Sequence, residues 1–340
     1  MKTTWCFGVV VAFLAVLQSL AAADSTPVTI TVASDHIDFL AGKDLVGRYQ
    51  FAAASDTPLA KPYLWPLYGP GGTPMTRDWP IKKGTPGEST DHVHQKSVWF
   101  CHGDVIPEGL EIKNKPKNVA GVDFWSEGKG HGRIVCRQHA EPKTADNHGS
   151  IVTVNEWQMA DGRKILDETR TIRLYNFGDT RLFVFDIDLH ASVVPITFGD
   201  TKEGSFGIRI NDRITEKSGN GKLENAEGKT GMKNCWGQLS AWCDYSGAVS
   251  GRTVGLAILD DPKNPFPACW HSRDYGLMAA NPFGRAGPQA LFPAMKGRTD
   301  LVRLDKGAHL KLRYGLLIHP GDAREGKVAE YFERFAKLNR

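Results

Sequence analysis

Hydrophobic and polar residues alternate in short runs along most of this 340-residue chain, and clusters of turn-forming residues separate the runs. A period of two places the apolar side chains on one face of an extended segment, which is typical of a β-strand with one buried face. The pattern predicts strands at residues 28–32, 45–52, 97–101, 151–157, 165–175, 182–189, 206–210, 254–259, 301–304 and 310–318.

Residues 170–189 contain the clearest pair of neighbouring strands. Two long alternating runs flank the turn-forming segment 176–179, which contains Gly178. Glycine accepts the positive φ angles that tight turns often need. The segment therefore predicts a β-hairpin, and an antiparallel sheet around it.

Helical periodicity occurs only at the end of the chain. Apolar side chains recur there at the spacing of one helix face, at Val328, Tyr331, Phe332, Phe335 and Leu338. Asp322 and Glu325 have the spacing of a capping box, in which two side chains bind the free N–H groups at a helix start. We therefore predict one amphipathic C-terminal helix.

The predicted strands span the chain without a linker-like change of composition or a repeat of fixed period. This distribution predicts an all-β fold: one large two-sheet antiparallel β-sandwich over residues 24–340, with long loops and the C-terminal helix. The polar connections 69–96, 106–119 and 215–233 are longer than usual. Such loops often carry function, and we expect the site among them.

Charge excludes one class of partner. The chain has 42 basic and 38 acidic residues, a net charge of +4, and the two signs are interspersed. Nucleic-acid-binding proteins usually carry a concentrated basic patch. We therefore expect no nucleic-acid partner.

The first 23 residues have the organisation of a signal peptide. Lys2 is followed by an apolar stretch at 6–20 and by small residues at 21–23, before Asp24. A membrane anchor is the competing interpretation, but the apolar stretch is shorter than the roughly 20 residues of a spanning helix. We predict cleavage before Asp24, export to the periplasm or the extracellular space, and no membrane span in the mature chain.

Five cysteines follow the predicted signal peptide: Cys101, Cys136, Cys235, Cys243 and Cys269. An odd number leaves at least one thiol unpaired in an oxidising compartment. Cys235 and Cys243 are the best candidates for a bridge because a turn can join them. The alternative is that all five are buried thiols.

The densest group of chemically active side chains is the segment 91–104, which contains His92, His94, His102 and Asp104. If it is extended, alternation places the three imidazoles on one face. Imidazole is a frequent metal ligand and titrates near neutral pH, so the segment predicts either a metal site or an acid/base site. A third possibility is that one ring binds a backbone carbonyl and the others are solvated.

Two other regions indicate a polar pocket. Aromatic residues alternate with charged ones from Lys61 through Tyr68 to Arg77, as in a wall that stacks on sugar rings, although large aromatics are also common in cores. Further polar side chains stand beside glycines near predicted strand ends or on a long loop: Arg209, Asn211, Glu227, His271, Arg273 and Asn281.

The motifs resemble a family. Segments 61–72, 76–80, 91–104, 122–125 and 281–284 are similar to the PmoA-like family, whose members are exported β-rich proteins of unknown activity. Val93 and Gln95 stand where that family often has proline and a third histidine. The methane monooxygenase subunit that lends the family its name spans the membrane with several helices, so we reject that activity here.

At the level of the fold, the predicted sandwich is similar to galactose-mutarotase-like supersandwiches, which act on sugars with a histidine and a carboxylate. This likeness implies that His94 or His102 donates a proton and that His271 or Glu227 removes one. Under it, Arg77, Arg209 and Arg273 hold hydroxyls or a carboxylate of the substrate. From the polar and aromatic segments themselves we also predict substrate binding by Lys61, Tyr68, Asp104, Asn211 and Asn281.

These observations predict an exported protein that performs acid/base chemistry on a carbohydrate or another small polar substrate, as an epimerase, lyase or hydrolase. One alternative is a non-catalytic carbohydrate-binding or scaffold protein of the cell envelope. Another is a mononuclear metalloprotein in which His92, His94 and His102 hold one divalent metal.

Overall fold

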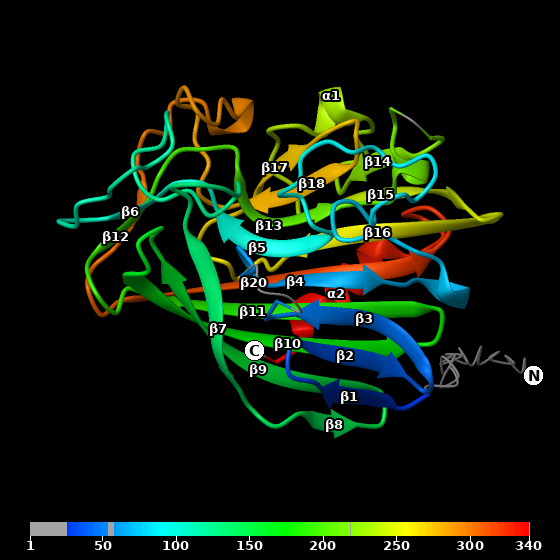
Figure 1. Ribbon diagram of the computed structural model, residues 1–340. Helices are drawn as coiled ribbons and strands as arrows, with labels where there is room; N and C mark the ends of the chain where they lie inside the picture. The colour runs from blue at the N-terminus through cyan, green and yellow to red at the C-terminus, as the bar shows by residue number, and fades with distance from the viewer. Residues whose placement is uncertain (1–25, 54–57, 218, 340) are drawn as a thin grey trace, which may run out of the picture.

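A computed structural model describes residues 26–53, 58–217 and 219–339 of the chain (Figure 1). The predicted signal peptide lies outside these residues. The described part consists mainly of β-strands arranged in two large antiparallel sheets, so the predicted all-β sandwich is confirmed.

The first sheet has eight strands in the order β1-β2-β3-β4-β5-β13-β18-β17, which Figure 1 shows from bottom to top. It joins the N-terminal quarter of the chain to strands that come much later. The strands are β1 (Val28–Val32), β2 (His36–Ala41), β3 (Asp44–Gln50), β4 (Tyr63–Leu67), β5 (Val98–His102), β13 (Gly204–Arg209), β17 (Cys269–Ser272) and β18 (Leu277–Asn281).

The second sheet has nine strands, eight of them in the order β14-β15-β16-β20-β11-β10-β9-β7, with β8 paired to β9. The strands are β7 (Arg133–His139), β8 (Lys143–Ala145), β9 (His148–Gln158), β10 (Lys164–Phe177), β11 (Thr180–His190), β14 (Lys222–Asn225), β15 (Trp242–Val249), β16 (Arg252–Asp260) and β20 (His309–Pro320). The predicted hairpin is confirmed as β10 and β11, with Gly178 in its turn at a φ of 79°.

Three short strands form a small separate sheet in the order β19-β12-β6. They are β6 (Val105–Pro107), β12 (Ile196–Phe198) and β19 (Val302–Leu304). The described residues also form the short helix α1 (Met232–Cys235) and the longer helix α2 (Val328–Lys337). None of the helices in this part of the chain is both long enough and apolar enough to cross a bilayer.

The main core lies between the two large sheets. Phe39 packs edge-on against Phe183 at 5.3 Å, and Phe206 packs against Tyr314 at 5.2 Å, in each case across the two sheets. We call the face of the eight-stranded sheet that carries these rings its inner face and the opposite one its outer face. Because strand side chains alternate, each strand of this sheet presents every second residue to the outer face.

Helix α2 covers the other side of the nine-stranded sheet, where Val328 and Phe335 pack with Leu182, Val184 and Leu317. The predicted amphipathic helix is confirmed. The capping box also forms, because Glu325 N–H donates to Asp322 and Asp322 N–H donates to Glu325. It closes the turn just before α2 rather than the first turn of the helix itself.

Strands β17 and β18 were not among the expected strands. Both are buried on both faces at every position, so their sequences lack the apolar and polar alternation of a half-exposed strand. All five described cysteines are free thiols, and the predicted Cys235–Cys243 bridge is not formed. A hydrogen bond from Cys243 lowers the pKa of Cys235, so the two thiols are nonetheless neighbours.

Candidate active site

The three histidines of segment 91–104 do not share one extended strand, and that prediction is wrong. Gln95 N–H donates to the carbonyl of His92, and His92 has a φ of 43°, so residues 92–95 form a turn. Strand β5 begins only at Val98. His102 therefore lies on a strand, whereas His92 and His94 lie on the loop before it.

His102 faces the inner side of the sheet, together with Phe100 of the same strand. It is completely buried between Phe198 and Phe283, and its Nε2 lies 2.9 Å from the carbonyl oxygen of Gly199. Burial lowers the pKa of His102 to about 4. These contacts make His102 a structural residue, so its predicted roles as proton donor and metal ligand are wrong.

His94 and His271 come together on the outer face, where each ring lies near the indole of Trp125. The ring centroids of His94 and Trp125 are 6.5 Å apart, and those of Trp125 and His271 are 6.3 Å apart. Trp125 itself stands edge-on at 5.1 Å from Trp99, the outward residue of β5. A carboxylate oxygen of Glu203 lies 4.0 Å from Nδ1 of His271. We call His94, Trp125, His271 and Glu203 the Trp125 cluster.

The environment keeps both imidazoles of this cluster neutral at pH 7. Burial, followed by the charge of Lys61, lowers the pKa of His94 to about 4. Burial and the charge of Arg273 lower the pKa of His271 well below its usual value. Burial raises the pKa of Glu203, whose side chain is nevertheless 34% exposed. The cluster thus combines neutral imidazole rings with a carboxyl group that retains its proton more readily than usual.

Arg273 determines which nitrogen of His271 is protonated. Its Nε lies 3.1 Å from Nε2 of His271, and a guanidinium group only donates hydrogen bonds. Nε2 therefore accepts, and the proton of the neutral ring is on Nδ1, which faces Glu203. Arg273, predicted to bind substrate, thus has a partner within the protein and orients this ring.

Arg77 and Arg209 are completely buried and share the carboxylate of Asp91, at 2.5 and 2.9 Å. Both guanidinium groups also donate to Ser89, and Arg209 donates to Gln95. Burial alone raises the pKa of Asp91, but the charges of Arg209 and Arg77 lower it to about 2. The two arginines therefore hold the loop 89–95, and through it His92 and His94, over the outer face.

His92 extends this network towards solvent. Its ring stacks on Tyr275 at 5.0 Å, and its Nδ1 lies 3.1 Å from Asp91. Arg209 lies 4.6 Å from the centre of the Tyr275 ring.

The ring centroids of His92 and His94 are 5.7 Å apart. Within the part of the chain that the structure describes, no group of three or more His, Cys, Asp or Glu side chains could hold a metal, and the proposed three-histidine site does not form.

Lys61 binds the segment that carries Trp125. Its buried ammonium group donates to the carbonyl oxygen of Trp125 at 2.7 Å and to Glu127 at 3.3 Å. Lys96 donates to the other oxygen of Glu127 at 2.6 Å. Although burial raises the pKa of Glu127, these two lysines lower it overall. Lys61, predicted to contact substrate, instead positions the segment that carries Trp125.

Three other predicted binding residues hold loops through backbone contacts. Asp104 accepts from the N–H of Gly121 at 2.6 Å. Asn281 accepts from the N–H of Phe283 and donates to the carbonyl of Thr201, and Asn211 donates to the carbonyl of Pro74. These bonds engage their polar atoms with the backbone of the protein itself.

Two predicted residues lie elsewhere. Glu227 is exposed in the loop after β14, at the edge of the nine-stranded sheet, where its N–H donates to Asn225. Tyr68 follows β4 and lines a small hollow with Trp65 and Lys82. Glu227, one of the two residues predicted to remove a proton, therefore lies away from His271, and the carboxylate beside His271 is that of Glu203.

Trp125, Glu203, Asp91 and Tyr275 were not assigned to the site from the sequence. Asp91 directly precedes His92, and Tyr275 follows Arg273 by two positions, so proximity to the predicted residues could have found them. Trp125 belongs to a motif that carried the family resemblance. Glu203 stands in an ordinary polar loop before β13, and no sequence signal marks it.

A family model matches residues 36–333, and its description is "Family of unknown function (DUF6807)". This match does not show the PmoA-like family that the motifs resemble. No curated protein matches the chain.

Solved structures show a distant likeness. The galactose 1-epimerase from Lactobacillus acidophilus NCFM has 9% identity and a TM-score of 0.42, over 86% of this chain and 98% of that one. A putative aldose 1-epimerase from Escherichia coli K12 has 11% identity and a TM-score of 0.32, over 86% and 99%. The alpha-galactosidase from Lactobacillus brevis has 9% identity and a TM-score of 0.39, over 92% and 43%. At these scores the likeness carries no argument about this chain.

Proposed function

Since the chain belongs to this family of unknown function, we propose its activity from the site itself: acid/base catalysis on a carbohydrate at the Trp125 cluster. One observation carries the proposal. A partly exposed imidazole that stays neutral, His94, and a partly exposed carboxyl group with a raised pKa, Glu203, flank the same buried pair of Trp125 and His271.

In this proposal Glu203 is the general acid and His94 is the general base. A carboxyl group with a raised pKa gives up a proton near neutral pH, and a neutral imidazole accepts one. His271 is buried and acts as a positioning residue, because its protonated Nδ1 faces Glu203. Proton transfer to one sugar oxygen and from another group of the ring supports epimerisation, elimination or hydrolysis.

The test is a screen of purified protein against reducing sugars and oligosaccharides by proton NMR, which detects anomer exchange, new unsaturated signals and new reducing ends. We expect turnover of at least one sugar, reduced about 10²–10⁴-fold in Glu203→Gln and in His94→Gln. His309→Gln is the matched control, since His309 is exposed on the other sheet. Full turnover in Glu203→Gln would overturn the assignment.

A non-catalytic carbohydrate-binding function is the second candidate. The observation that favours it is the stacked pair of His92 and Tyr275, of which the His92 side chain is 38% exposed. Aromatic rings at a surface bind the C–H faces of sugars. This function predicts sugar binding without turnover, and binding that persists in Glu203→Gln.

Export is part of the proposal. A leader at residues 1–23 supports it through its basic start, its apolar stretch and its small residues. N-terminal sequencing of the protein from the cell exterior or periplasm is expected to begin at Asp24. Retention of Met1 on a cytoplasmic product would contradict it.

A further inference from the structure

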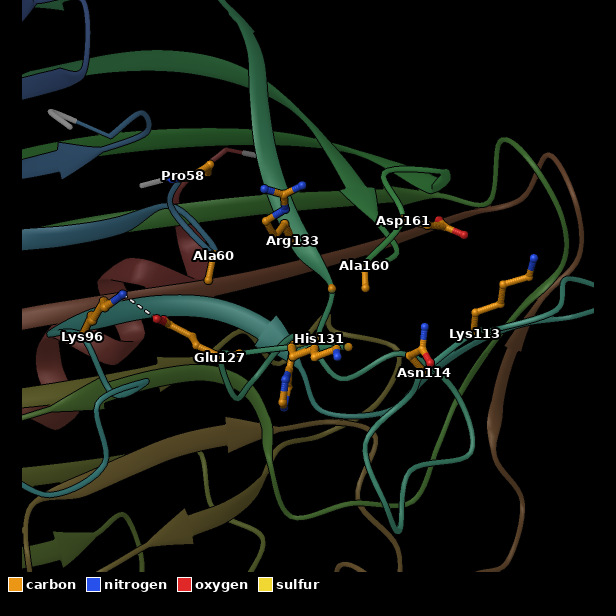
Figure 2. Close-up of a pocket in the computed structure, with 14 residues that line it drawn as sticks. Pro58, Ala60, Lys96, Lys113, Asn114, Glu127, His131, Arg133, Ala160 and Asp161 are labelled. Carbon is orange, nitrogen blue, oxygen red and sulfur yellow. Dashed lines mark hydrogen bonds and ion pairs between the residues drawn. The ribbon is translucent and has the colours of Figure 1, made fainter. Parts of the chain in front are cut away.

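A cavity of about 660 Å³ is lined by the Lys96–Glu127 ion pair, in which Glu127 follows Trp125 by two residues (Figure 2). This volume is in the range of small-molecule sites. The walls come mainly from the loop after Trp125, the loop around Lys113 and the first residue of β7, and the turn at Ala160 and Asp161 completes the lining on another side. The charged and polar side chains that matter for the argument are Lys96, Lys113, Glu127, Lys129, His131 and Arg133.

The acidic residues of the cavity already have basic partners. Glu127 binds Lys61 and Lys96. Asp161, at the opposite wall, pairs with Arg163 at 2.8 Å, and Arg163 is not part of the lining. The carboxylates of the cavity are therefore compensated before any ligand enters.

Three basic residues of the lining lack such partners. Within residues 26–53, 58–217 and 219–339, the side chains of Lys113, Lys129 and Arg133 make no ion pair and no hydrogen bond. Arg133 is half-buried at the start of β7, and Figure 2 shows its guanidinium group among the lining side chains. The cavity thus has an excess of positive charge.

The wall is built by backbone that approaches closely. Gly130 has a φ of 84°, and a Cβ atom there would lie 2.0 Å from the carbonyl oxygen of Asn114. A Cβ atom at Gly132 would lie 2.5 Å from the ring of Phe124. The glycines let the loop after Trp125 pack against the loop around Lys113, which fixes the position of the basic residues on both.

We propose that this cavity binds the anionic group of an acidic carbohydrate, a carboxylate or a sulfate ester, at Arg133, and that Lys113 and Lys129 attract it by their positive charge. The planar guanidinium group of arginine binds two anionic oxygens at once, and the lysines add charge at the rim. The carbohydrate class rests on the proposed function. Lys96 and Glu127 line the cavity and follow His94 and Trp125, respectively, by two residues. An acidic unit bound here would therefore place a neighbouring unit of the same carbohydrate towards the Trp125 cluster.

The experiment is isothermal titration calorimetry of the whole protein with three tetrasaccharides: oligogalacturonate, a sulfated galacto-oligosaccharide and the neutral galacto-oligosaccharide. We expect one or both anionic ligands to bind at least tenfold more tightly than the neutral one, with affinity that falls as salt rises. Comparison of the two anionic ligands identifies carboxylate or sulfate as the preferred group.

Arg133→Gln tests the residue, and Arg137→Gln is the matched control. Arg137 lies on the same strand but pairs with Glu156 and does not line the cavity. We expect a loss of at least tenfold in anionic affinity for Arg133→Gln and a change of less than twofold for Arg137→Gln. Equal affinity for neutral and anionic ligands, or equal effects of the two variants, would overturn the proposal.

A double variant, Lys113→Gln with Lys129→Gln, replaces exposed side chains and keeps the test decisive if Arg133→Gln does not fold. It is expected to weaken anionic binding at least threefold, and unchanged affinity counts against the cavity. Binding is measured without turnover. Loss of catalysis in the proposed function therefore leaves this result intact, and a failed binding test leaves the roles of His94 and Glu203 intact.

Discussion

The two faces of the eight-stranded sheet use histidine in opposite ways. On the inner face, His102 is sealed between two phenylalanine rings and bound to a backbone carbonyl. On the outer face, His94 remains partly exposed and shares Trp125 with His271. Burial lowers the pKa of all three rings. A lowered pKa therefore does not identify a catalytic histidine. Exposure of the ring to solvent and a second titratable side chain nearby are what distinguish it.

Buried arginines show the same contrast. Between the sheets, Arg170 pairs with Glu168, and both side chains are fully enclosed. On the outer face, Arg77 and Arg209 share Asp91, whose side chain is 41% exposed. The inner pair stabilises a core, whereas the outer group fixes a loop that carries two histidines to the surface.

The largest expected effect separates His94 from His102. His94→Gln should lower turnover of the true substrate about 10²–10⁴-fold, because it removes the proposed base, and should leave the thermal midpoint nearly unchanged. His102→Gln should keep the turnover of each folded molecule. Steady-state kinetics corrected for the folded fraction measures both, and a similar loss in the two variants would erase the distinction between the faces.

His102→Ala should lower the free energy of unfolding by about 3 kcal/mol. The change removes the bond to Gly199 and leaves a void between Phe198 and Phe283. Urea denaturation followed by fluorescence measures the loss. His309→Ala, at an exposed position, should change stability by no more than about 0.5 kcal/mol, and equal losses would show that His102 is not structural.

Asp91→Asn should destabilise the protein by roughly 2 kcal/mol, because it leaves two buried guanidinium groups without their shared charge. Partial exposure of Asp91 keeps the loss below that of a fully buried pair. The loop 89–95 should also exchange its amide protons faster. Asp305→Asn, which breaks an exposed pair with Arg303, is the control and should have almost no effect on either measurement.

The smallest expected effect, measured per pH unit, is a difference in acid sensitivity. The pKa of His102 is about 4 in the folded protein and about 6.5 when unfolded, so between these values the unfolded chain binds more protons. Stability is therefore unaffected above pH 6.5 and falls as the pH decreases towards 4, by at most about 1.4 kcal/mol per pH unit for this ring. His102→Phe should show a shallower decline in urea titrations from pH 7 to pH 4.5. An unchanged dependence of stability on pH in this variant would contradict the lowered pKa assigned to His102.

The local sequence pattern was enough to predict much of the fold. The hairpin of β10 and β11, the C-terminal helix and the reciprocal bonds of Asp322 and Glu325 depend on residues close together in the chain. Their periods and spacings are visible without knowing the rest of the molecule. Strands β17 and β18 were missed because burial on both faces removes the alternation.

The site was only partly predictable. His94, His271, Arg77 and Arg209 were expected to come together, and the structure places them on one face of the sheet. His102 was grouped with His94 on the assumption of a continuous strand, which the turn at 92–95 interrupts. Glu227 was chosen as the carboxylate because it lies on a long loop, whereas Glu203 lies beside His271.

The sequence by itself determined the β-rich class, the hairpin, the C-terminal helix and the supply of imidazole and guanidinium groups, since periodicity and composition act locally. Only the tertiary structure decided which face of the sheet each group occupies. A one-residue change of register reverses the direction of every side chain on a strand. Strand β13 pairs with β5 on one side and with β18 on the other, which joins segments about 70 to 100 residues apart, and this pairing places His271 beside Trp125 and buries His102.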